Sequence, residues 1–97
     1  MLLFVEFDIS ADIIDVPQEV IDNREQLRRQ FLKWLFSPDI KKKYTVTVNG
    51  HRGLCFRSEA FVEFLNKKVL KDSTQKAIIV QQEVSIRNGQ NLPSVFF

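Results

Sequence analysis

The stretch from Tyr44 to Arg57, YTVTVNGHRGLCFR, decides the fold that we expect for this chain. Residues up to Asn49 alternate between apolar and polar types, as in a strand with two different faces. Asn49-Gly50 is a strong hairpin signal, because both residues tolerate the positive φ angles of a tight turn. The predicted register pairs Val48 with His51, Thr47 with Arg52 and Thr45 with Leu54.

This register gives the hairpin two chemically different faces, because side chains alternate along a strand. The first face carries Tyr44, Val46, Val48 and Cys55. The second face carries Lys43, Thr45, Thr47, Arg52, Leu54 and Phe56. We expect the first face to be buried, which would make Cys55 an inert core thiol.

Outward from the hairpin, the chain alternates between strand and helix patterns. Residues 2–9 (LLFVEFDI) predict a strand, residues 10–15 a loop, and residues 17–36 a long helix with a break possible near residue 22. Ser58 precedes an apolar pattern typical of a helix over 59–70. Residues 76–86 are rich in β-branched types and favour a strand, although Asp72 and Ser73 are also suitable caps for a helix there.

The resulting order is strand, helix, strand, strand, helix, strand. It predicts an α+β fold, a two-layer sandwich in which an antiparallel sheet carries two helices on one face in a ferredoxin-like order. We expect one domain over residues 1–91, with a turn at Asn88-Gly89, followed by a hydrophobic tail over 92–97.

Composition restricts the classes of protein to which the chain can belong. Its 97 residues are 44% hydrophobic and 27% charged, as in one small globular domain. No apolar run is long enough for a membrane span. The N-terminus lacks a basic signal-peptide region, and the single Cys suits a reducing compartment, so we expect a cytoplasmic protein.

Charge is distributed unevenly along the chain. Residues 1–25 contain seven acids and one base, whereas residues 26–57 contain eight bases and one acid. Such a division is typical of a site for a polyanion, or of oppositely charged parts that face each other within the fold or across a dimer. We expect the second arrangement.

The residue pattern predicts no enzymatic chemistry, cofactor or metal site. His51 and Cys55 lie four residues apart on one predicted strand, about 13 Å from each other and beyond hydrogen-bond reach. Asp8, Asp12 and Asp15 lack the spacing of a calcium loop. No glycine-rich loop is available to bind phosphate. We therefore expect a non-catalytic protein.

The sheet face away from the helices is the expected binding surface. It would expose Phe4, Leu54 and Phe56, and aromatic residues on an open sheet stack on the bases of single-stranded RNA. The stretches Leu3-Phe4-Val5 and Arg52-Gly53-Leu54-Cys55-Phe56 resemble the two signature strands of the RNA recognition motif. Leu54, Arg57 and Glu59 differ from that pattern, and we do not assign the chain to the family.

These observations lead to two functional hypotheses. The first is a protein-interaction domain, homodimeric or regulatory, since an exposed apolar face or tail commonly marks an interface. The second is a single-stranded nucleic-acid-binding module that uses the open sheet face. The candidate partner-binding residues are Phe4, Lys43, Arg52, Leu54, Phe56, Val95, Phe96 and Phe97.

Overall fold

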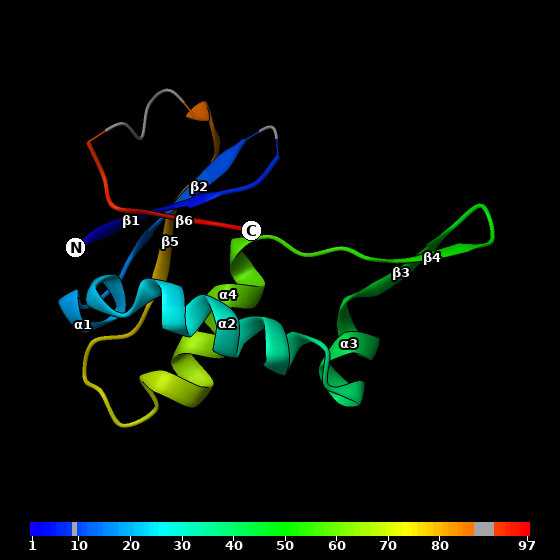
Figure 1. Cartoon of the computed structure of the whole chain (residues 1–97), viewed down its shortest axis with the longest axis horizontal. Coiled ribbons are helices and arrows are strands. Elements are labelled where there is room, and N and C mark those ends of the chain that lie inside the picture. The colour runs from blue at the N-terminus through cyan, green and yellow to red at the C-terminus, as the bar shows by residue number, and fades with distance from the viewer. Residues whose placement is uncertain (9, 87–90) are drawn as a thin grey trace.

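The structure is a computed structural model that describes residues 1–8, 10–86 and 91–97. Figure 1 shows a body that contains both termini and a hairpin arm that projects away from it. In chain order the elements are β1 (Leu2–Glu6), β2 (Ala11–Asp15), α1 (Gln18–Asp22), α2 (Arg24–Leu35), α3 (Pro38–Tyr44), β3 (Thr45–Val48), β4 (His51–Leu54), α4 (Ser58–Phe64), the π-helical segment η1 (Leu65–Val69), β5 (Ile78–Val84) and β6 (Ser94–Phe96).

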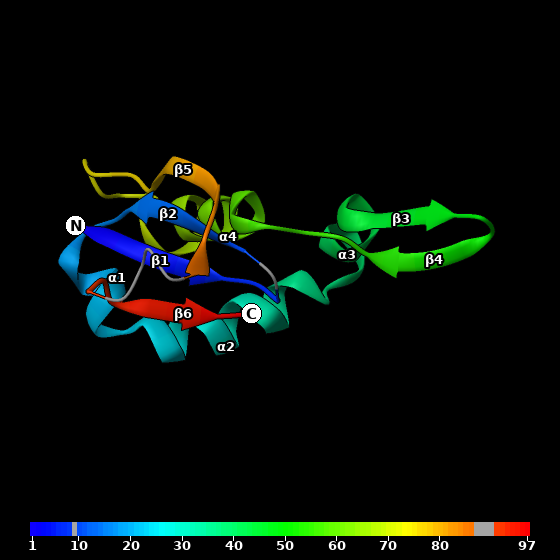
Figure 2. The same ribbon diagram turned by 90° about the horizontal axis from the view of Figure 1, so that it is seen from above.

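The body is built on a mixed four-stranded sheet in the order β5-β2-β1-β6. β1 pairs antiparallel with β2, β2 pairs antiparallel with β5, and β6 lies parallel to β1. Figure 2 shows the four strands side by side, and Figure 1 shows β1, β2 and β6 above α2 and α4. The sheet thus joins the first strand of the chain to the last.

The main core lies between this sheet and the helices. Leu3, Val5 and Ile14 point from the sheet toward the helices, and Phe31 and Phe61 fill the space from the helix side. Five aromatic rings surround Phe31 at centroid distances of 5.2–6.0 Å; they belong to Trp34, Phe56, Phe61, Phe64 and Phe97. Aromatic side chains therefore account for most of the bulk in the centre of the core.

β3 and β4 form a separate two-stranded sheet. Their register pairs Val48 with His51, Thr47 with Arg52 and Thr45 with Leu54, which confirms the predicted pairing. Asn49 and Gly50 adopt φ angles of 52° and 79°, as the tight turn requires. The hairpin is therefore the element predicted most accurately, although it does not join the main sheet.

Several other predictions are confirmed. The fold is α+β and residues 78–84 form a strand. A helix is found where one was expected after residue 58, but Ser58 is its first residue and does not cap it, and the α-helix ends at Phe64 before the π-helical segment. The long N-terminal helix breaks at Asn23, between α1 and α2. The turn expected at Asn88-Gly89 lies outside the described residues.

Three expectations about the fold are wrong. Residues 11–15, expected as part of a loop, form the central strand β2, because Ala11, Ile14 and the buried Asp12 fit a strand that is covered on both faces. Tyr44, expected in the first strand of the hairpin, is instead the last residue of the helix α3 (Pro38–Tyr44), which begins at a proline in the first turn. The sheet is mixed, and the ferredoxin-like order is not found, because the hairpin stands apart and residues 94–96 pair with β1.

Candidate functional site

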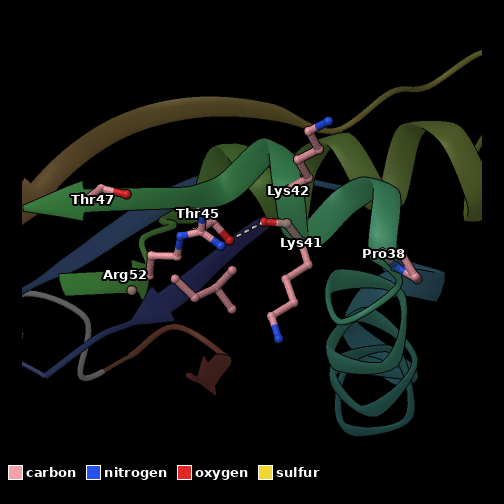
Figure 3. Close-up of a pocket in the computed structure, with 8 residues that line it drawn as sticks. Pro38, Lys41, Lys42, Thr45, Thr47 and Arg52 are labelled. Atoms are coloured by element: carbon pink, nitrogen blue, oxygen red, sulfur yellow. Dashed lines mark hydrogen bonds between the residues drawn. The ribbon is translucent and has the colours of Figure 1, made fainter. Parts of the chain in front are cut away.

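A groove of about 680 Å³ lies between α3 and one face of the hairpin arm. Lys41 and Lys42 of α3 and Thr45, Thr47 and Arg52 of the arm belong to its lining. Figure 3 shows that the Lys41 and Lys42 side chains leave α3 in opposite directions, and that Lys42 points away from Thr45 and Arg52. Pro38, Gly53 and Leu54 complete the lining. The groove thus combines three cations, two hydroxyl groups and a small apolar surface.

Local sequence explains why α3 lies beside the arm. Ser37-Pro38 ends α2 and begins α3, since proline fits the first turn of a helix but not its interior. The Thr45 hydroxyl donates a 2.6 Å hydrogen bond to the carbonyl oxygen of Lys41, shown as the dashed line in Figure 3. This bond ties the first residue of β3 to the last turn of α3.

The base of the arm is anchored to the body. The Cys55 amide donates a 2.9 Å hydrogen bond to the Tyr44 carbonyl oxygen, and Lys43 forms an ion pair with Glu63 of α4. The hydrogen bond with Glu63 raises the pKa of Lys43. Partial burial and the neighbouring Glu63 carboxylate raise the pKa of Tyr44. Lys43, expected to bind a partner, is therefore engaged with Glu63.

Two of the candidate partner-binding residues, Arg52 and Leu54, line the groove. Phe96 lies on the edge strand β6 with its side chain 53% exposed. Val95, the preceding residue on the same strand, is buried in the main core. The tail residues therefore contribute to the sheet.

The expected open aromatic platform is wrong. Phe4 is 1% exposed and packs with Ala11, Val84 and Leu92 on the far side of the main sheet. Phe56 belongs to the aromatic core, where it contacts the ring of Phe97 at 6.3 Å. Phe4 and Leu54 lie in different sheets, because the hairpin does not extend the sheet that contains β1.

The opposite face of the hairpin is exposed, contrary to expectation. Val46 is 45% exposed and Val48 is 63% exposed. Cys55, expected to be buried, is also exposed. The expected burial of Val46, Val48 and Cys55 assumed that helices would cover the hairpin. These residues are exposed because the arm extends beyond the helices (Figure 1).

The structure contains a buried polar network that the sequence analysis did not predict. The fully buried Asp12 carboxylate accepts hydrogen bonds from Arg57 at 3.0 Å, the Ser58 hydroxyl at 2.5 Å and the Glu83 amide at 2.9 Å. The Arg57 guanidinium also lies 4.6 Å from the centroid of the Phe7 ring. The network joins β2, β5 and the start of α4, so its role is to hold these elements together.

Sequence spacing gave partial signals for these features. Ser37-Pro38-Asp39 before three lysines is a typical helix start, and it could have indicated α3, which was not predicted. No local pattern indicated that Asp12 would pair with Arg57, because 45 positions separate them.

The described residues offer no metal site and no membrane-spanning helix. Within residues 1–8, 10–86 and 91–97, no three His, Cys, Asp or Glu side chains are grouped to hold a metal ion. No helix in the described part of the chain is long and apolar enough to cross a membrane. Comparisons found no matching family model, no matching curated protein and no matching solved structure.

Proposed function

We propose that this chain is a non-catalytic protein-interaction domain and that the hairpin arm is its binding element. The observation that carries the proposal is the exposure of Val46 and Val48 on one face of an arm that projects from the body. Paired exposed valines on a strand form an apolar surface that a protein partner can cover.

The energetics of the arm support this proposal. An isolated two-stranded hairpin is only marginally stable in water, and residues 46–53 of this arm are all exposed. A partner that packs on the Val46–Val48 face would supply a second layer. Aliphatic side chains also lack a π-face on which a nucleic-acid base could stack, so this face suits a protein.

The test compares two double variants that keep the strand-forming shape of the residue. Val46→Thr with Val48→Thr makes the arm polar, and Ile78→Thr with Val80→Thr makes the same change on β5, where the residues are 56% and 54% exposed. Tagged wild type and both variants are used to capture partners from native lysate, with and without nuclease, and light scattering measures self-association.

We expect the same captured protein, or the same dimer, to be lost from the arm variant and kept by the β5 variant. Equal behaviour of the two variants contradicts the proposal. Capture that disappears only after nuclease treatment also contradicts it.

Single-stranded nucleic acid is the second candidate ligand, and the three cations of the groove are the observation in its favour. Binding through phosphates weakens steeply as salt rises. Titration of a labelled oligonucleotide at two salt concentrations tests this candidate, and affinity that ignores salt rejects it.

A further inference from the structure

We infer that the groove between α3 and the arm binds an extended, acidic segment of the protein partner. This inference rests on the proposed function, since the groove and the Val46–Val48 face are opposite sides of the same arm. A partner that contacts both the groove and the Val46–Val48 face would fix the orientation of the arm.

The charge of the groove is not neutralised within the described part of the chain. Lys41, Lys42 and Arg52 form no ion pair with any described residue. The acid of α3, Asp39, does not line the groove. The lining of one groove thus has three cationic residues without an ion-pair partner, spread over both sides of α3 and the arm, and they attract an extended ligand that carries several negative charges.

The rest of the lining suits a polypeptide. Leu54 and Pro38 provide an apolar surface for a side chain of the ligand. At Gly53 an added Cβ would meet no atom within 4 Å, so the backbone is open to approach there. Both outer edges of the two-stranded sheet lack a neighbouring strand among the described residues, which leaves backbone groups for an extended chain.

The lining favours a peptide over single-stranded nucleic acid. Proteins that bind single strands combine a basic groove with aromatic rings on which bases stack. No aromatic residue lines this groove. The exposed ring of Phe36 is close by, but Lys41 Nζ lies over it at 5.9 Å from the centroid. Carboxylates spaced along a peptide can pair with the cations without any stacking partner.

Fluorescence anisotropy on the full chain tests the inference. The probes are a labelled peptide that alternates Glu with Leu and Thr, the same peptide with Gln in place of Glu, and labelled oligothymidylate. The proteins are wild type, Lys42→Ala with Arg52→Ala, and the charge-matched control Lys68→Ala with Lys71→Ala, two lysines that do not line the groove. Circular dichroism confirms that each variant is folded.

We expect wild type to bind the Glu peptide roughly tenfold more tightly than the Gln peptide. The groove variant should lose about tenfold in affinity for the Glu peptide, and the control less than about twofold. Equal affinity for the two peptides, or equal losses in the two variants, would overturn the inference.

Tighter binding of oligothymidylate that depends on Lys42 and Arg52 would also overturn the inference, in favour of nucleic acid. The outcome is separable from that of the proposed function. If the peptide test fails while Val46→Thr with Val48→Thr still abolishes capture of the partner, the arm remains the binding element and only the acidic ligand is rejected.

Discussion

Arg57 donates a 3.0 Å hydrogen bond from Nη2 to Oδ1 of Asp12, and this ion pair joins the start of α4 to the middle of the main sheet. Asp12 is fully buried, whereas the Arg57 side chain is 30% exposed. Burial raises the pKa of the Asp12 carboxyl, but hydrogen bonds from Arg57, Ser58 and the Glu83 backbone outweigh burial and hold the pKa below its ordinary value of 3.8. The carboxylate is therefore the charged centre about which three segments assemble.

Replacing this carboxylate should destabilise the whole domain. Asp12→Asn removes the negative charge and leaves Arg57 without its ionic partner, so we expect a loss of about 2–4 kcal/mol in the free energy of unfolding. Asp15→Asn is the control, because Asp15 pairs with the N-terminal ammonium at the surface and should contribute less than about 1 kcal/mol. Urea denaturation measures both variants, and similar losses would show that burial of the Asp12 pair does not matter.

The lowered pKa of the Asp12 carboxyl predicts how the stability of the domain depends on pH. Since the pKa of Asp12 is lower in the folded protein than in the unfolded chain, its contribution is fully present above the unfolded value, near 3.8. It is lost as the pH falls through the lower pKa of the folded state. The melting temperature of wild type should therefore fall more between pH 5 and pH 2 than that of Asp12→Asn. Parallel curves for the two proteins would contradict this assignment.

The sequence predicted those elements whose signals are local. The hairpin register follows from Asn49-Gly50, and the strand β5 follows from its β-branched residues. The helices α2 and α4 follow from apolar residues at helical spacing. What the sequence could not predict is which strands are neighbours, because hydrophobic alternation is the same for a hairpin in a sheet and a hairpin that stands apart.

The errors at the candidate site follow from this gap. Phe4, Leu54 and Phe56 share a face only if β1 and β4 belong to one sheet, and they do not. Arg52 lies on the predicted face of the hairpin, because the hairpin register alone sets that face, and this face lines the groove beside α3. The prediction was wrong for residues such as Phe4, whose expected surroundings depended on which strands are neighbours. It was correct for residues such as Arg52, whose face depends only on the local register of the hairpin.

The aromatic core predicts a sharp contrast between two phenylalanines near the same end of α2. Phe31 is fully buried with five aromatic neighbours, whereas Phe36 is 58% exposed. We expect Phe31→Ala to cost about 3–5 kcal/mol in the free energy of unfolding through lost burial and a cavity. Phe36→Ala should change it by less than about 0.5 kcal/mol. Denaturant titrations measure both, and a small loss for Phe31→Ala would contradict the central place of its ring.

A substitution in the turn of the arm should weaken the hairpin without affecting the body. Gly50 has a φ of 79° and open space around its Cα, so an alanine there meets backbone strain without a steric clash. We expect Gly50→Ala to weaken the hairpin by about 1 kcal/mol, which is roughly a fivefold faster amide exchange in β3 and β4.

Gly53→Ala is the matched control for this variant, since Gly53 has the same open surroundings but no positive φ. Alanine there should leave exchange in the arm unchanged or slower, because glycine is unfavourable within a strand. Amide exchange followed by NMR reports the arm and the body separately. Because the two sheets are not joined, exchange in β1 and β2 should stay at its wild-type rate in both variants. Faster exchange in β1 and β2 of Gly50→Ala would mean that the arm and the body unfold as one unit, which would remove the basis for treating the arm as an independent binding element.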